Sequence, residues 1–245
     1  MTSATELVSK AERIAVLTGA GISTASGIPD FRGPQGVWTK NPAAQAMFDI
    51  DEYVASRAVR VEAWKFRLAA PVWTAEPNAG HLALVALEKQ GRLAGLATQN
   101  IDGLHEKAGS SPALIHELHG TVRYVDCLSC ARRIPMEEVL PRLAAGDEDP
   151  ACEVCGGILK SATVSFGQSL DPAVLDAAAA ATRSADLFLA IGTSLQVYPA
   201  AGLCDHALNA GIPLIVVNAQ PTPYDEDATA VLTTPIETTL PALVG

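Results

Sequence analysis

Three short runs of apolar residues stand out along the chain, and polar or glycine residues follow each of them. The runs cover residues 14–17, 187–191 and 214–217. Continuous apolar runs of this length are typical of strands buried on both faces of a parallel sheet. Two weaker strands are expected at residues 93–98 and 114–118.

Helical stretches separate these predicted strands. They are expected at residues 79–89, 172–182 and 200–210, and Asp171 followed by Pro172 suits the start of a helix. Strands that alternate with helices predict an α/β fold with a doubly wound parallel sheet. Ligands of such sheets bind beyond the carboxyl ends of the strands, so we expect the polar strand ends to face one crevice.

The middle of the chain has a different composition. Residues 121–160 hold four of the five cysteines and an acidic turn at 146–150. We therefore expect a small insert domain over 121–160, placed between two parts of the sheet domain, residues 1–120 and 161–245.

Composition and charge narrow the classes of function. Apolar residues make up 49% of the 245 residues and charged residues 18%, which is typical of a folded globular chain. The net charge of −10 disfavours nucleic acid as a partner, because phosphate binding requires a cationic surface, but it permits cationic peptides. No apolar run approaches the ~20 residues of a membrane span. We also expect no membrane association and a cytoplasmic location, where disulfides are rare.

Four cysteines form two Cys-x-x-Cys pairs, Cys127 with Cys130 and Cys152 with Cys155, separated by 21 residues. Two such pairs supply four sulfur ligands for a tetrahedral zinc ion, and a site with four protein ligands is structural. The alternatives are free or disulfide-bonded cysteines, or a zinc ribbon that binds nucleic acid, which the surrounding acidic residues disfavour. The fifth cysteine, Cys204, is expected to be a small buried apolar residue.

A glycine-rich turn follows the first predicted strand, with Gly19, Ala20 and Gly21 leading to Ser23. Such a turn allows backbone amides to approach a pyrophosphate. It departs from the fingerprint of hydride-transferring enzymes, because Thr24 replaces the third glycine and no acidic residue follows at the expected distance of ~20 positions. A polar loop over residues 28–34 follows instead, and taken alone it could also be an ordinary surface turn in which Asp30 pairs with Arg32.

Polar side chains also follow the predicted strand at 93–98, namely Gln99, Asn100 and Asp102. Polar groups need partners when they are buried, so we expect these side chains to line a crevice and bind a sugar and an amide. Of the five histidines, only His119 ends a predicted strand immediately before a glycine. Histidine is suited to proton transfer near neutral pH, which makes His119 a candidate general base.

Together these motifs resemble the sirtuin family of NAD-dependent protein-lysine deacylases, in its short bacterial form. The resemblance spans residues 15–218 and rests on motifs that occur in the family's order. They are GAGIS at 19–23, GIPDFRG at 27–33, TQNID at 98–102, HG at 119–120, the two cysteine pairs, FG at 166–167, GTS at 192–194 and Asn218.

The resemblance implies a Rossmann-like NAD-binding domain, one structural zinc, and NAD as a consumed co-substrate. It implies that His119 acts as the base, with Asn100 and Asp102 as further catalytic residues. The residues that it places around NAD are Gly19, Ala20, Gly21, Ser23, Asp30, Phe31, Arg32, Gln99, Asn100, Ile101, Asp102, Gly192, Thr193, Ser194 and Asn218.

The partners that the resemblance implies are proteins or peptides with acylated lysines. Such a peptide is expected to add as a strand between residues 165–167 and 195–198. The residues expected to contact the substrate are Val164, Phe166, Gly167, Val197, Trp64 and Arg67.

The sequence does not determine which acyl group on lysine is preferred. Family members selective for acidic acyl chains carry Tyr-x-x-Arg, where this chain has Trp64 and Arg67. Either these two residues line an acyl pocket, or Trp64 packs in the core and Arg67 is solvated. We favour the second possibility and therefore deacetylation, with desuccinylation, mono-ADP-ribosyl transfer and NAD hydrolysis as alternative activities. A zinc-bearing binding module without catalysis is a further alternative, which the presence of His119 disfavours.

Overall fold

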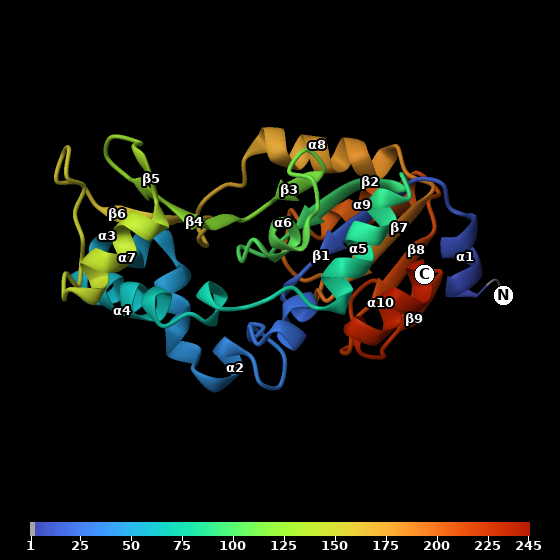
Figure 1. The fold of residues 1–245 in the computed structure, drawn as a ribbon, viewed down its shortest axis with the longest axis horizontal. Helices are drawn as coiled ribbons and strands as arrows, with labels where there is room; N and C mark the ends of the chain where they lie inside the picture. The colour runs from blue at the N-terminus through green and yellow to red at the C-terminus, as the bar shows by residue number, and fades with distance from the viewer. Residues whose placement is uncertain (1–2) are drawn as a thin grey trace.

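A six-stranded sheet forms the larger part of the molecule, in a computed structural model that describes residues 3–245 (Figure 1). The strand order is β3-β2-β1-β7-β8-β9, and every neighbouring pair is parallel. The strands are β1 (Ile14–Thr18), β2 (Leu93–Thr98), β3 (Ile115–Glu117), β7 (Leu187–Ile191), β8 (Leu214–Val217) and β9 (Ala230–Leu232). All five predicted strands are confirmed, and β9 is an addition at the sheet edge.

Helices cover both faces of this sheet because successive strand residues point to opposite sides. Val16 and Leu189 pack with α1, α5 and α10 on one face, whereas Leu17 and Phe188 pack with α8 and α9 on the other. The helices of this part are α1 (Ala4–Lys10), α5 (Ala79–Lys89), α6 (Leu104–Ala108), α8 (Pro172–Arg183), α9 (Gly202–Asn209) and α10 (Ile236–Val244). The predicted doubly wound α/β fold is therefore confirmed.

A three-stranded antiparallel sheet lies at the opposite end of the molecule and forms a smaller lobe (Figure 1). Its order is β5-β4-β6, with β4 (Gly120–Cys127), β5 (Arg133–Pro135) and β6 (Leu159–Thr163). The remaining helices are α2 (Val37–Lys40), α3 (Ile50–Ala55), α4 (Arg57–Leu68) and α7 (Met136–Ala144), with 3-10 turns at Pro42–Phe48 and Pro71–Trp73. A further 3-10 turn, Ala20–Ser26, follows β1 at the edge of the large sheet.

The core of the small lobe joins two segments that are distant in the sequence. Trp64 of α4 is 2% exposed and packs with Val125 of β4 and with Met136 of α7. Arg60 of the same helix forms an ion pair with Asp149 in the acidic turn, at 3.0 Å. Helix α4 thus belongs to the packing of the small lobe, although it lies outside residues 121–160. The division into 1–120 with 161–245 and a 121–160 insert is retained as a proposal.

Within residues 3–245, every helix falls short of the length and hydropathy that a membrane span requires.

Candidate active site

The glycine-rich turn after β1 meets the turn after β7 at the carboxyl edge of the large sheet. Gly19 N–H donates to Ile191 O at 3.0 Å, and Gly21 N–H donates to Gly192 O at 2.8 Å. A Cβ atom on Gly21 would lie only 2.7 Å from the Gly192 Cα, so this approach of two backbones requires glycine. The meeting point is where the strand order reverses, with β2 on one side of β1 and β7 on the other, the usual ligand position in such sheets.

A buried polar network lies beneath this turn. Ser23 Oγ donates to Asp102 Oδ2 at 2.7 Å, and Asn100 Nδ2 donates to Ser23 Oγ at 3.2 Å and to Gly19 O at 3.1 Å. Ser23 is fully buried and Asn100 is 8% exposed. The predicted polar residues of two separate motifs therefore form one cluster at the edge of the sheet.

His119 lies in the turn between β3 and β4, next to this network. Its Nδ1 is 3.0 Å from Gln99 O. A carbonyl oxygen can only accept, so Nδ1 carries the proton and Nε2 is left with a lone pair. Burial lowers the pKa of His119 below 6.5, with the Gln99 contact acting in the opposite direction. The imidazole is thus neutral at pH 7 and can act as a base through Nε2.

The segment after β7 is linked to the same network. Gln99 Nε2 donates to Thr193 Oγ1 at 2.8 Å, and that oxygen also accepts from Leu195 N–H at 3.2 Å. Ser194 is half-buried beside these residues. Asn218 follows β8 and is 7% exposed, with its Nδ2 bound to Gln220 O at 2.8 Å. Gly192 and Asn218 lie on adjacent strands of the sheet, because Gly192 N–H donates to Val217 O.

The loop over residues 28–40 carries Asp30, Phe31 and Arg32. Asp30 Oδ1 accepts from Gly33 N–H at 3.0 Å, and the Arg32 guanidinium lies over the Trp38 ring at 4.5 Å. The Phe31 ring contacts Trp38 and Phe48, with centroids 4.9 and 5.6 Å apart.

These contacts form an aromatic cluster that sequence reasoning did not anticipate. The cluster joins the rings of Phe31, Trp38, Phe48, Phe66 and Phe166, which come from distant segments. It contains four of the chain's five phenylalanines, and no spacing pattern in the sequence connects them. The cluster joins the 28–40 loop to the segment around Phe166, one of the predicted substrate residues.

Two buried histidines behind the polar network were also missed. His105 is 3% exposed, and its Nε2 is 2.9 Å from Thr18 Oγ1. Its ring centroid is 5.0 Å from that of His81, which is fully buried. Burial lowers the pKa of His105 to about 3 and also lowers that of His81, against the charge of Asp102, so burial favours the neutral form of both rings.

The remaining predicted residues have the following contacts and exposures. Ala20 opens the 3-10 turn after Gly19, and Ile101 O accepts from Val122 N–H. Val164 N–H donates to His119 O at 2.8 Å, so the predicted substrate segment begins beside the base. Phe166 is 46% exposed and Val197 is half-buried. Gly167 has a φ of +85°, a left-handed conformation that favours glycine.

The expectation that Arg67 is solvated is wrong. Arg67 is 9% exposed, because α4 turns it toward the interior of the small lobe, on the same side as the buried Trp64. Trp64 packs in the core as expected. Both residues line a cavity of about 40 Å³ together with Tyr53, Lys160 and Val164.

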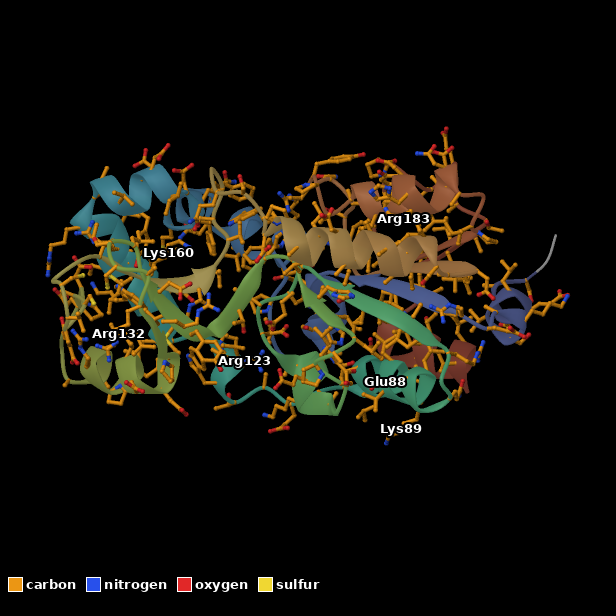
Figure 2. All side chains as sticks on the ribbon, turned by 90° about the horizontal axis from the view of Figure 1, so that it is seen from above. Glu88, Lys89, Arg123, Arg132, Lys160 and Arg183 are labelled. Carbon is orange, nitrogen blue, oxygen red and sulfur yellow. The ribbon has the colours of Figure 1, made fainter. Side chains whose placement is uncertain are left out.

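This cavity holds two cations that lack an acidic partner. Lys160, on β6 in the small lobe, is 5% exposed, and its Nζ donates to the carbonyl oxygens of Ser161 and Thr163 (Figure 2). Within residues 3–245, neither Lys160 nor Arg67 forms an ion pair. Burial lowers the pKa of Arg67 to about 10 and that of Lys160 to about 8. Buried charges of one sign favour an anionic ligand.

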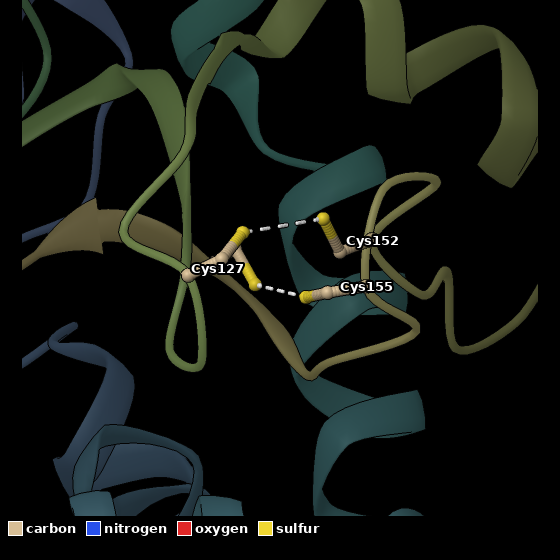
Figure 3. Close-up of side chains that lie close together, drawn as sticks. Cys127, Cys152 and Cys155 are labelled. Carbon is tan, nitrogen blue, oxygen red and sulfur yellow. Dashed lines mark hydrogen bonds between the residues drawn. The ribbon is translucent and has the colours of Figure 1, made fainter.

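The four predicted metal ligands come together in the small lobe, and Figure 3 shows Cys127, Cys152 and Cys155 in close-up. The sulfur atoms of Cys127, Cys130, Cys152 and Cys155 all lie within 4.8 Å of one another, and all five cysteines are free. A backbone N–H of Cys130 lowers the pKa of the Cys127 thiol to about 6, which favours a thiolate. Four such sulfurs fit a structural zinc ion. Cys204 is fully buried in the sheet domain, as expected.

The chain is similar in sequence and in structure to proteins of one family. The Sir2 family model matches residues 19–199. NAD-dependent protein deacetylase 2 of Streptomyces coelicolor is 49% identical over 231 residues, which cover 94% of this chain and 96% of the relative. A solved Sir2 variant with deacetylated p53 peptide and 3'-O-acetyl ADP ribose has a TM-score of 0.90 at 35% identity, covering 98% of this chain and 95% of its own. Sir2Tm bound to a propionylated peptide has a TM-score of 0.85 at 34% identity, covering 96% and 93%. The chain therefore belongs to the Sir2 family.

Proposed function

We propose that the protein is an NAD-dependent protein-lysine deacetylase that transfers the acetyl group from lysine to ADP-ribose and releases nicotinamide. The observation that carries this proposal is the fixed tautomer of His119, whose Nδ1 is bound to the carbonyl of Gln99, the residue directly before Asn100 of the Asn100–Ser23–Asp102 network. The relative named NAD-dependent protein deacetylase and the Sir2 structure with acetyl ADP ribose support it.

The proposed roles follow from the position of each side chain. The turn from Gly19 to Gly21, with Ser194, receives the phosphates of NAD, because this turn lies at the carboxyl edge of the sheet, where the strand order reverses. Gln99, Asn100 and Asp102 orient the nicotinamide ribose and carboxamide. The substrate carbonyl oxygen attacks the anomeric carbon as nicotinamide leaves. His119 then removes a proton from a ribose hydroxyl, which starts the transfer of the acetyl group.

The remaining predicted NAD contacts complete this arrangement. Asn218 and Gly192 lie toward the adenosine half, Ile101 and Asp30 near the nicotinamide half, and Phe31 covers the sugar after nicotinamide has left. Arg32 supports the 28–40 loop by stacking on Trp38.

We propose that the acetylated peptide adds as a strand beside residues 165–167. Phe166 already pairs with its neighbours on one side, because its N–H donates to Phe48 O at 2.7 Å and its carbonyl accepts from Ile50 N–H at 3.0 Å. Gly167 follows with a φ of +85°, so the chain turns away directly after this bridge and Phe166 stays exposed to a peptide. Pairing there demands little of the peptide sequence, and the 195–198 loop closes the opposite edge.

The His119→Ala variant tests the proposed mechanism. We expect NAD-dependent deacetylation to fall by at least about 100-fold, because the general base is lost, with an unchanged melting temperature. His206→Ala, at an exposed position of α9, is the matched control. Full activity of His119→Ala would overturn the mechanism. Mass spectrometry of the products distinguishes O-acetyl-ADP-ribose from ADP-ribosylated protein or free ADP-ribose, the products of the alternative activities.

A broader deacylase activity is a second candidate function, favoured by the buried and unpaired Arg67. Its guanidinium and Lys160 line one small cavity, where the carboxylate of a succinyl chain would neutralise them. We expect kcat/KM on succinyl-lysine peptide to fall at least about tenfold in Arg67→Met, with acetyl-lysine activity less affected. Lys65→Met is the control, because Lys65 lies on the same helix with an exposed side chain. A wild-type enzyme without activity on succinyl-lysine would exclude this candidate.

The proposed partners are proteins or peptides with acylated lysines, and neither nucleic acid nor a membrane is part of the proposal. We further propose a cytoplasmic location, which the five free cysteines favour.

A further inference from the structure

A cluster of two tyrosines and an aspartate lies beside the proposed peptide site and has no part in the mechanism above. Tyr198 Oη is 2.7 Å from Tyr224 Oη. Tyr224 Oη donates to Asp205 Oδ1 at 2.9 Å, and Tyr198 Oη lies 3.3 Å from Asp205 Oδ2. Each phenol has one proton, so Tyr224 donates to Asp205 Oδ1 or to Ala201 O at 3.2 Å, and Tyr198 donates to Tyr224 Oη, its nearer acceptor, or to Asp205 Oδ2. Tyr224 and Asp205 together thus anchor the Tyr198 hydroxyl.

The two tyrosines differ in exposure. Tyr224 is 5% exposed and belongs to the core on the α8 and α9 face of the sheet. Tyr198 is 63% exposed, although its hydroxyl is anchored. One edge of its ring lies near Gly202 at the start of α9, where an added Cβ would be 3.6 Å from the Tyr198 ring. The ring is therefore held at its tip and on one face, and its other face is open to solvent.

Tyr198 lies in the 195–198 loop, so the hydrogen bonds of its hydroxyl also hold this loop in place. It lies at the end of the loop that begins at Leu195, whose N–H is held by Thr193 Oγ1. Between these two attachments, Gln196 and Val197 lie in the segment that closes the peptide groove in the proposed function. If the Tyr198 hydroxyl were released, the loop would keep only its backbone attachments, from Leu195 N–H to Thr193 Oγ1 and from Ala201 N–H to Val197 O. A peptide would then have to order the Tyr198 side chain on binding, which weakens affinity.

We propose that Tyr224 is a positioning residue for the acyl-lysine peptide, because its hydrogen bond to Tyr198 holds the 195–198 loop in its peptide-binding form. This inference rests on the proposed function. Burial raises the pKa of Tyr224, so its hydroxyl keeps the proton that it donates to Asp205 or Ala201. The acceptor that Tyr198 requires is therefore present at all pH values at which the enzyme works.

The test compares Tyr224→Phe with wild type in the full chain, using an acetyl-lysine peptide and NAD as probes. We expect the KM for the peptide to rise about tenfold, the effect of one lost hydrogen bond near a charged group. We expect kcat and the KM for NAD to stay within about twofold, because neither the base nor the NAD contacts change. Tyr124→Phe, at a partly exposed tyrosine on β4, is the control and leaves all three values unchanged.

Tyr198→Phe provides a second route to the same bond without altering the core. It is expected to raise the peptide KM at least as much as Tyr224→Phe, because it also removes the contact of Tyr198 with Asp205 Oδ2. The double variant is expected to add nothing beyond Tyr198→Phe, because the Tyr198–Tyr224 hydrogen bond is already absent there. A peptide KM unchanged in both single variants overturns the proposal, and so does a loss of kcat at constant KM. If wild type releases no nicotinamide with any acetyl-lysine peptide, the proposed function fails instead, and calorimetric titration of the peptide still compares the variants.

Discussion

At the scale of single residues, the chemistry of the site depends on backbone contacts more than on side-chain pairs. His119 has no carboxylate partner to orient it, and a backbone carbonyl, Gln99 O, fixes its tautomer instead. Gln99 is itself held by Thr193 across the crevice. A base oriented by a neutral carbonyl keeps the lowered pKa that burial gives it, because no nearby negative charge raises it again.

This arrangement predicts the pH dependence of the reaction. The folded pKa of His119 lies below its ordinary value of 6.5, so the active neutral form dominates above that pH and is lost as pH falls through the lowered pKa. We expect kcat/KM for deacetylation to be flat through neutral pH, with its acidic limb centred below 6.5. The measurement is a pH profile of kcat/KM, with circular dichroism at each pH to show that the fold persists. An acidic limb centred above 6.5 would contradict the assignment.

The buried histidines add a separate effect on stability. His105 has a folded pKa of about 3, whereas the unfolded chain binds a proton near 6.5. The unfolded state therefore takes up more protons below pH 6.5, and stability is complete above that pH and decreases as pH falls toward 3. We expect the free energy of unfolding to drop by about 1.4 kcal/mol per pH unit for this group. Urea unfolding at several pH values between about 3 and 6.5 measures how steeply the free energy of unfolding falls with pH. The variant His105→Asn should show a smaller fall.

At the scale of elements, the two cysteine knuckles hold the small lobe together. Cys127 ends β4, and both Cys127 and Cys152 are 2% exposed within the core that contains Trp64. The metal site is thus continuous with the apolar core and does not project from it. Loss of the metal would leave buried thiols in mutual contact and loosen the packing of α4 and α7.

Removal of one ligand should therefore affect stability as well as metal content. We expect Cys130→Ala to lose the single bound zinc and to lower the melting temperature by roughly 10 °C, because structural zinc contributes many kcal/mol to folding. Zinc content by atomic emission and a thermal scan are the measurements. Cys204→Ala is the control, since Cys204 is buried in the sheet domain and away from the knuckles. Retention of zinc by Cys130→Ala would refute the assignment.

The strands and the zinc ligands could be predicted from the sequence, whereas the burial of Arg67 and the aromatic cluster could not. The strands of the large sheet were predictable because each is a continuous apolar run, such as Leu214 to Val217. The polar strand ends followed from the parallel topology, and the zinc ligands from their spacing. The burial of Arg67 and the aromatic cluster around Phe48 were not predictable. Both arise where α4 and the 28–48 segment pack against strands that lie about a hundred residues later, and such contacts leave no periodic signal.

At the scale of the whole molecule, the net charge of −10 acts on association. A negative field attracts cationic peptides over a range set by the Debye length, which is ~10 Å at 0.1 M salt. The field has no effect on the geometry of the crevice, so it should alter the rate of encounter and leave the chemical step unchanged.

This predicts a salt dependence that varies with the peptide. For an acetyl-lysine peptide flanked by lysines, kcat/KM should fall roughly threefold between about 0.05 and 0.3 M salt, with kcat unchanged. For the same peptide with glutamines in place of the flanking lysines, kcat/KM should stay constant. Equal salt dependence for both peptides would show that the charge of the protein has no part in substrate capture.

The packing of α4 against distant strands also has a consequence for biosynthesis. Trp64 leaves the ribosome 88 residues before Cys152, with which it shares the core of the small lobe. At translation rates of about 5–20 residues per second, Cys152 is synthesised on the order of 4–18 s after Trp64, and the apolar side of α4 stays exposed during this time. During that interval the nascent chain presents this surface to chaperones. Metal supply can influence folding only once the second knuckle has emerged, so zinc limitation should reduce the yield of folded enzyme at a late stage of synthesis.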